Sequence, residues 1–186
     1  MFVLLLLILL IVACDQITKW LAVIYLQNGS GVEVIPNILR FTYVENRGAA
    51  FGMLDGHRWV FMLLSVLAIT GLLIFLWRKP PKSLFCRIAI AFLIGGGIGN
   101  MIDRTLLGYV IDFIDFCAFP EIWMWVFNVA DAFVTVGTGM LMLYLVCELV
   151  RDFRREREEK LMAAGTAAES AAEDSSNEEG KDNDGE

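Results

Sequence analysis

The chain has 186 residues, and 57% of them are hydrophobic, a share too high for an ordinary soluble domain. Its formal net charge of −7 comes from the C-terminal end, because eight acids and one base follow Met162 and the rest of the chain has fourteen of each. The neutral body contains no basic stripe with interleaved aromatic residues, so nucleic acid is excluded as an expected partner.

Four apolar segments are long enough to cross a bilayer, for which about 20 residues suffice. In chain order they cover residues 2–26, 59–77, 84–102 and 122–150. The sequence therefore predicts an all-α membrane protein with four transmembrane helices, formed by residues 1–160. Residues 161–186 are rich in Ala, Ser, Glu and Gly and predict an acidic, disordered C-terminal tail.

Positive charge predicts the orientation of these spans. Bases gather between the second and third spans, at Arg78, Lys79, Lys82 and Arg87, and five more follow the fourth span at residues 151–160. Loops rich in Lys and Arg stay in the cytoplasm. We therefore expect a multi-pass protein with both termini cytoplasmic and with residues 27–58 and 103–121 facing outward.

The first outward segment carries short, alternating runs of β-branched residues. Val32–Val34 and Leu39–Val44 are separated by Pro36 and Asn37, which favour a turn. This pattern predicts a small extracytoplasmic β segment on the outer side of the membrane.

The N-terminus admits a second interpretation, a lipoprotein precursor cleaved before Cys14. Residues 11–14 form a passable lipobox after an apolar run. However, no basic segment precedes the run, and the apolar sequence resumes after Lys19 to complete a full span. The four cysteines form no CxxC pair and His57 is the only histidine, so we expect no metal site and no cofactor.

Several polar residues lie inside the spans, where they are costly and mark function or a specific helix contact. Asp15 and Lys19 are four residues apart on one helical face and can neutralise each other. In the third span the glycine-rich run 95–99 allows close helix packing. We expect the residues that follow it, Asn100, Asp103 and Arg104, to support the site.

Two further aspartates, Asp112 and Asp131, have apolar neighbours and no base nearby in sequence. Asn128 lies three residues before Asp131 and so shares its helical face. Two carboxyls brought together share a proton, so that one serves as base toward a water and the other as acid toward a carbonyl. From the residues alone, an intramembrane aspartic hydrolase and a proton-coupled carrier both remain open.

Five ordered blocks resemble the lipoprotein signal peptidases (type II signal peptidases), a family of bacterial membrane aspartic proteases. The resemblance covers about residues 2–150, and the acidic tail lies outside it. The blocks are Asp15-Gln16-Ile17-Thr18-Lys19, Glu45-Asn46-Arg47-Gly48-Ala49-Ala50-Phe51, Gly95-Gly96-Gly97-Ile98-Gly99-Asn100-Met101-Ile102-Asp103-Arg104, Tyr109-Val110-Ile111-Asp112-Phe113 and Phe127-Asn128-Val129-Ala130-Asp131.

The resemblance implies that Asp112 and Asp131 are the catalytic pair. Residues that line or brace the site, or are further family positions, would be Asn46, Asn100, Arg104, Asn128, Asp103, Asp15 and Lys19. The implied activity is cleavage of diacylglyceryl-modified prolipoproteins just before the lipidated cysteine, without a metal or cofactor. We therefore expect a monomer in the bacterial cytoplasmic (inner) membrane, in contact with membrane lipids, with its active site toward the outer face.

Overall fold

The structure, a computed structural model, describes residues 2–48, 58–118 and 125–182, without the side chains of residues 163–182. Within these described residues, four helices and the strands of one four-stranded antiparallel sheet follow one another along the chain. The helices are α1 (Phe2–Leu26), α2 (Arg58–Arg78), α3 (Leu84–Leu106) and α4 (Val129–Asp182). The strands are β1 (Val32–Ile35), β2 (Leu39–Asn46), β3 (Val110–Phe116) and β4 (Val126–Phe127).

Three helices are long and apolar enough to cross a membrane among the residues described, namely α1, α3 and the part of α4 from Val129 to Met162. The remaining predicted span, residues 59–77, corresponds to α2, whose apolar part, Met62–Arg78, is shorter. The chain is therefore mostly helical with a small sheet. Large apolar side chains cover much of the surface of these helices, as expected for helices that face lipid.

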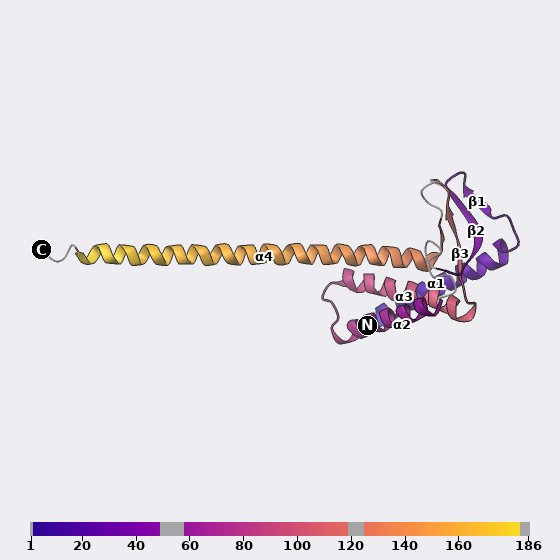
Figure 1. The fold of residues 1–186 in the computed structure, drawn as a ribbon, viewed down its shortest axis with the longest axis horizontal. Coiled ribbons are helices and arrows are strands. Elements are labelled where there is room, and N and C mark those ends of the chain that lie inside the picture. The colour runs from indigo at the N-terminus through magenta and orange to yellow at the C-terminus, as the bar shows by residue number, and fades with distance from the viewer. Residues whose placement is uncertain (1, 49–57, 119–124, 183–186) are drawn as a thin grey trace. The chain divides into compact units, whose positions relative to one another are not determined.

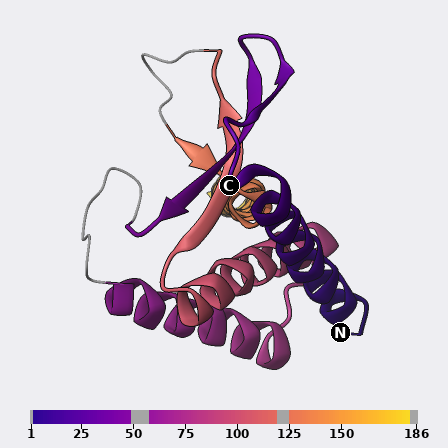
Figure 2. The ribbon, with the colours of Figure 1, turned by 90° about the vertical axis from the view of Figure 1, so that its right-hand side faces the viewer.

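Helix α3 packs against both α1 and α2 and lies between them (Figure 2). Glycines make the packing close, because a Cβ at Gly95 would lie 2.9 Å from Ile11 and a Cβ at Gly96 would lie 2.5 Å from the carbonyl oxygen of Ala130. The glycine run therefore brings α3 against α1 on one side and the start of α4 on the other.

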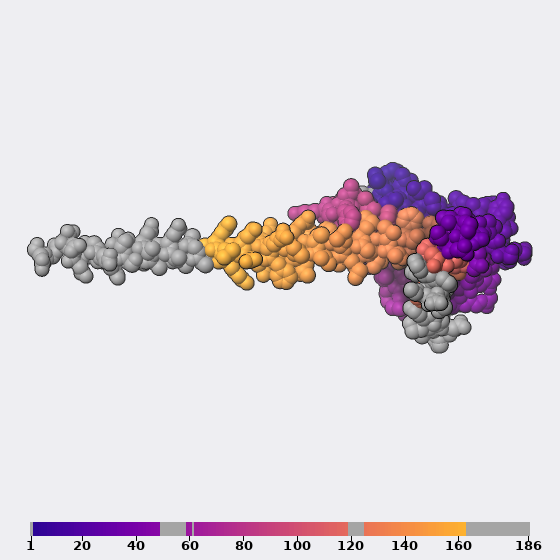
Figure 3. Space-filling view, turned by 90° about the horizontal axis from the view of Figure 1, so that it is seen from above, coloured from indigo at the N-terminus to yellow at the C-terminus, as the bar shows by residue number. Residues whose placement is uncertain are grey.

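The predicted hairpin is confirmed, since β1 and β2 pair antiparallel through a turn in which Asn37 has a φ of 58°. The order in the sheet is β1-β2-β3-β4, so the hairpin continues into β3 (Figure 1) and the sheet ends in the two-residue strand β4. The sheet covers the end of α1, where Ala22 and Leu26 form a core cluster with Ile111 and Phe113. In the space-filling view, α1 and the hairpin lie side by side in indigo and purple (Figure 3).

The fourth span begins later than the predicted residue 122. Residues 119–124 are outside the described part, Val126 and Phe127 form β4, and α4 starts at Val129. Pairing with β3 holds Val126 and Phe127 in an extended conformation although their sequence is apolar. Similarly, residues 103–106, predicted to face outward, still belong to α3.

The C-terminal segment also differs from its prediction, because α4 continues as a helix to Asp182 instead of becoming disordered after Lys160. Six alanines and several glutamates in residues 163–182 have high helix propensity, which explains the helix. The chain divides into two compact units, Met1–Met142 and Leu143–Glu186, so the division falls within α4. All functional residues discussed below belong to the first unit.

Candidate active site

Asp112 lies on β3 and is 2% exposed. Its two carboxyl oxygens accept hydrogen bonds from two asparagines, one from Asn46 Nδ2 at 2.9 Å and one from Asn128 Nδ2 at 2.6 Å. Burial, followed by the charge of Asp131, raises the pKa of Asp112 to about 7, although the two asparagine hydrogen bonds act in the opposite direction. The protonated form of this carboxyl is therefore favoured far more than in an aspartate exposed to water.

Asp131 lies in the first turn of α4, where Asn128 is the N-cap residue. The side-chain oxygen of Asn128 accepts from the backbone N–H of Asp131 at 2.9 Å, and the backbone N–H of Asn128 donates to Asp131 Oδ2 at 3.3 Å. This reciprocal arrangement is a capping box. The other oxygen of Asp131 accepts from Asn100 Nδ2 at 2.7 Å.

Asn128 therefore links the two aspartates, because it bonds to Asp112 through its side chain and to Asp131 through both side chain and backbone. Asp112 and Asp131 also line one cavity of about 640 Å³. The remaining residues of its wall are Asn46, Gly48, Arg104, Trp125, Val126, Phe127, Ala132, Thr135 and Val136. The wall is thus polar around the carboxyls and apolar along β4 and α4.

A buried ion cluster lies next to this pair. The ammonium of Lys19 is 2.9 Å from a carboxylate oxygen of Asp15 and 2.9 Å from one of Asp103, and all three side chains are at most 3% exposed. Gln16 adds hydrogen bonds to Asp15 at 3.2 Å and to Asp103 at 3.0 Å. The cluster joins α1 to α3 by charge as well as by packing.

Each charged member of this cluster also holds a residue next to the aspartate pair. Lys19 donates to Asn100 Oδ1 at 2.9 Å, which leaves the Nδ2 end of that amide directed at Asp131. Asp15 accepts from the backbone N–H of Ala130 at 2.8 Å, one of the first N–H groups of α4 that have no partner within the helix.

Asp103 is the third charged member, and it accepts from the backbone N–H of Ile111 at 3.1 Å. Because Ile111 directly precedes Asp112, this bond ties β3 to α3 beside the carboxyl. The cluster therefore positions the strand of one aspartate and the helix of the other.

The sequence-predicted site residues fall into three groups. The cavity wall contains Asp112, Asp131, Asn46 and Arg104. Asn100 and Asn128 contact the two carboxyls by hydrogen bonds. Asp15, Lys19 and Asp103 form the ion cluster, so the predicted pairing of Asp15 with Lys19 is confirmed, and Lys19 is an ion-pair partner of Asp103 as well.

Sequence reasoning missed several cavity residues and the role of Gln16. Thr135 lies four residues after Asp131 and hence on the same helical face, a spacing from which its position can be derived. Trp125 and Phe127 carry no such signal, because Phe127 reaches the cavity from β4 and Trp125 directly precedes this strand, which was not predicted. Among the residues that the structure describes, no three His, Cys, Asp or Glu side chains are grouped so that they can hold a metal ion.

Comparison with known proteins identifies the family. The sequence model described as signal peptidase (SPase) II matches residues 7–147, well over half of the chain. The chain belongs to the signal peptidase II family. Its homologues in this family are aspartic peptidases, in agreement with the paired carboxyls on one cavity.

Relatives in the signal peptidase II family match over most of their length. A lipoprotein signal peptidase from Symbiobacterium thermophilum is 43% identical over 139 residues, covering 73% of this chain and 88% of the relative. A lipoprotein signal peptidase from Clostridioides difficile is 42% identical over 142 residues, covering 76% of this chain and 93% of the relative. A solved structure described as a bacterial membrane enzyme is 33% identical, with a TM-score of 0.74 over 80% of this chain and 90% of that one.

Proposed function

We propose that this protein is the intramembrane aspartic endopeptidase that removes the signal peptide from diacylglyceryl-modified prolipoproteins, cleaving just before the lipidated cysteine. One observation carries the proposal: two carboxyls, Asp112 and Asp131, line the same cavity and are linked by Asn128 in a member of the signal peptidase II family. Relatives that match this chain over most of its folded part are named lipoprotein signal peptidases.

The chemistry requires one carboxylate and one carboxylic acid. The carboxylate takes a proton from a water molecule, whose oxygen attacks the carbonyl carbon of the scissile peptide bond. The acid gives its proton to the carbonyl oxygen. When the tetrahedral species collapses, the C–N bond breaks, the departing nitrogen takes the proton of one carboxyl, and a hydroxyl of the former gem-diol returns its proton to the pair. The pair then again holds one proton, as at the start.

The pKa of Asp112 suits it to the acid role, because a carboxyl with a pKa of about 7 is still largely protonated slightly below neutral pH. The first turn of α4 suits Asp131 to the base role, because a helix N-terminus favours negative charge. Arg104 contributes a positive charge to the same wall, next to the position where negative charge develops.

The apolar part of the cavity wall is an argument that the substrate carries a lipid. Phe127 of β4 and Ala132 and Val136 of α4 extend the wall from the carboxyls along a helix that is apolar enough to span the membrane. A diacylglyceryl chain attached to the substrate cysteine can therefore remain among apolar side chains while the peptide bond lies at the carboxyls.

We place the protein in the bacterial inner membrane with four spans, and α2 is one of them. Its 21 residues correspond to about 30 Å of helix, the thickness of a bilayer core. The basic residues near 78–87 and 151–160 support cytoplasmic termini and an outward active site. A cysteine introduced at Lys82 should react with a membrane-impermeant reagent only after the membrane is opened, and labelling from outside would contradict this orientation.

Cleavage in the absence of an ion gradient tests the proposed function against a proton-coupled carrier. Purified protein in detergent should release the signal peptide from a diacylglyceryl-modified prolipoprotein, also in the presence of a chelator. The same precursor without the lipid should be cleaved poorly. Proton movement in liposomes without any cleavage would instead favour the carrier.

A further inference from the structure

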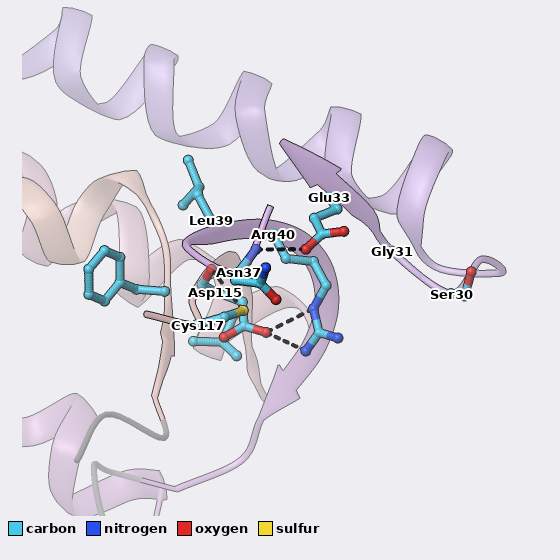
Figure 4. Close-up of a pocket in the computed structure, with 10 residues that line it drawn as sticks. Ser30, Gly31, Glu33, Asn37, Leu39, Arg40, Asp115 and Cys117 are labelled. Atoms are coloured by element: carbon cyan, nitrogen blue, oxygen red, sulfur yellow. Dashed lines mark hydrogen bonds and ion pairs between the residues drawn. The ribbon is translucent and has the colours of Figure 1, made fainter. Parts of the chain in front are cut away.

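A second cavity, of about 750 Å³, lies at the end of the sheet that carries the β1–β2 turn. It is lined by residues from the three longer strands and their flanking turns, and by one residue of β4. These residues are Ser30, Gly31, Glu33, Asn37, Leu39, Arg40, Asp115, Phe116, Cys117 and Val126 (Figure 4). Polar and apolar groups are mixed here, unlike in a hydrophobic core.

A row of directly paired residues crosses the sheet within this cavity. Glu33 pairs with Arg40, Arg40 with Asp115, and Asp115 with Val126, so that one residue from each strand contributes. The guanidinium of Arg40 donates two hydrogen bonds, at 3.0 and 2.5 Å, to the Oδ2 atom of Asp115. Both bonds converge on one oxygen (Figure 4), which leaves Oδ1 of Asp115 as an acceptor for another donor.

The charged groups of this row are two acids and one base. Glu33 and Asp115 are negative and Arg40 is positive, whereas desolvation and the neighbouring Asp115 raise the pKa of Cys117, so that the thiol stays neutral. Arg40 is 49% exposed and Asp115 is 16% exposed, so a ligand can reach both from solvent. The cavity therefore favours a ligand with a positive or hydrogen-bond-donating side chain.

The position of the row relates it to the active site. Val126 at its end also lines the cavity that contains Asp112 and Asp131. Along β3, Asp115 follows Asp112 by three residues, about 10 Å in an extended strand. Because Val126 at the sheet edge lines both cavities, an extended peptide that leaves the carboxyls past this edge covers a distance of about 10 Å in about three residues.

We propose that this cavity is a subsite for the part of the prolipoprotein that follows the lipidated cysteine, and that it prefers a basic residue there. The proposal rests on the proposed function, because it needs the peptide bond before that cysteine to lie at Asp112 and Asp131. The substrate has two ends with different requirements. The signal peptide and the acyl chains are apolar, whereas the segment after the cysteine is the part that continues away from the membrane and can meet a polar, charged cavity.

Substrate series test the subsite with the unaltered enzyme. Three diacylglyceryl-modified peptides would share one signal sequence and differ after the cysteine: lysines about three and four residues beyond the scissile bond, glutamates at the same positions, or an end directly after the cysteine. We expect kcat/KM to be about three- to fivefold higher for the lysine peptide than for the glutamate peptide, as exposed ion pairs give. The preference should shrink at high salt.

Variants then assign the preference to this cavity. Asp115→Asn and, separately, Glu33→Gln should each reduce the lysine-to-glutamate ratio, while kcat/KM for the short peptide stays unchanged. Glu148→Gln is the matched control, because it removes one exposed acid of an ion pair that belongs to the other compact unit. It should leave the ratio as it is.

Two results would overturn the subsite. One is equal cleavage of the lysine and glutamate peptides by the unaltered enzyme, and the other is a ratio that neither cavity variant changes. Loss of activity on all three peptides in Asp115→Asn would mean that Asp115 supports the sheet. The lysine-to-glutamate ratio of Glu33→Gln would then show whether the cavity binds the basic residue. If the unaltered enzyme cleaves none of the peptides, the proposed function itself fails.

Discussion

Asn128 uses its backbone and both ends of its side chain at the aspartate pair. Its Oδ1 atom caps the first turn of α4 through the N–H of Asp131, and its Nδ2 group donates to Asp112 at 2.6 Å. The side chain is completely buried. Since an amide has distinct donor and acceptor ends, these two bonds fix its orientation, and a carboxylate or hydrocarbon of similar size cannot make both.

Replacement of either aspartate should abolish cleavage. Asp112→Asn and Asp131→Asn should each lower kcat by about 1,000-fold or more, because an amide can neither accept a proton from water nor return one. The double variant should be no worse than either single one, since each carboxyl needs the other. Turnover of lipid-modified substrate would be measured beside thermal unfolding in detergent. Substantial turnover by a folded single variant would remove that residue from the catalytic pair.

The pKa of Asp112 predicts the alkaline side of the pH profile. If protonated Asp112 is the acid, kcat/KM should fall as pH rises through about 7, where this carboxyl loses its proton. The Asn46 hydrogen bond holds the pKa of Asp112 down, so Asn46→Ala should move this decline to higher pH even if the maximal rate is lower. The comparison uses profiles normalised to their maxima. A shift to lower pH would argue against Asp112 as the acid.

At the scale of elements, the sequence predicted the helices and the one hairpin, because these form from residues that are close together in the chain. Long apolar runs predicted α1, α2, α3 and the apolar first part of α4, and alternation around Pro36 and Asn37 predicted the β1–β2 hairpin. By contrast, β3 and β4 were missed. β4 has only two residues, and β3 is held by β2 across more than 60 residues of sequence, as in the pair of Asn46 with Val110.

The start of α4 shows a signal that hydropathy concealed. The apolar run begins at Ile122, so length and composition predicted a helix from there, yet α4 begins at Val129. Asn128 followed three residues later by Asp131 is the sequence pattern of a capping box, and it marks the correct boundary. Asn128 and Asp131, which were predicted to share a helical face near the active site, therefore also mark the N-terminal start of α4.

Part of the candidate site was likewise predictable and part was not. The spacing of Asp15 and Lys19 predicted their ion pair, because four residues equal about one helical turn. The bond from Asn100 to Asp131 and the ion pair of Lys19 with Asp103 join different helices, so no spacing in the sequence indicates them. The family resemblance supplied the list of residues, and the packing of α3 supplies their contacts.

Lys19 should be essential for folding because it neutralises two buried acids. Lys19→Met leaves Asp15 and Asp103 without their cation, which should cost about 3–5 kcal/mol of stability. The double variant Lys19→Met/Asp103→Asn should be more stable than Lys19→Met alone, since only one buried acid then remains. Unfolding in detergent measures both. If adding Asp103→Asn destabilises Lys19→Met further, the ion cluster is not what Lys19 stabilises.

Gly99 should tolerate no side chain, because a Cβ there would lie 2.5 Å from Oδ2 and 3.1 Å from the carboxyl carbon of Asp15. Asp15 cannot move aside without losing its bonds to Lys19 and to the N–H of Ala130. Gly99→Ala should therefore destabilise the protein by about 1–3 kcal/mol and lower activity. Gly139→Ala is the control, because nothing lies within 4 Å of its Cβ position, and it should be neutral or slightly stabilising. Equal effects of the two changes would contradict this packing argument.

At the scale of the whole molecule, charge and chemistry are separated along the chain. The residues that line the two cavities or position the Asp112–Asp131 pair lie between Asp15 and Val136, within the first compact unit. The family match ends at residue 147. The excess of acids follows Met162, after the basic residues 151–160. Residues 161–186 therefore carry the whole net charge of −7, whereas the described residues that line the two cavities all precede them.

A chain that ends after Lys160 should consequently remain an active enzyme. It keeps every residue of the cavities and also the basic segment at 151–160 that favours a cytoplasmic C-terminus. We expect kcat/KM for lipid-modified substrate to stay within about twofold, because none of the residues that line the cavities or bond to the two aspartates is removed. The comparison uses equal amounts of purified, folded protein.

A chain that ends after Met142 provides the contrasting control. It also keeps all cavity residues, but α4 then has 14 residues from Val129, about 21 Å, too short for a bilayer core of about 30 Å. This shorter chain should fail to insert stably and should lose activity. Loss of cleavage in a folded, inserted chain ending after Lys160 would show that the acidic segment takes part in catalysis. Full activity of the chain ending after Met142 would show that α4 need not span the membrane.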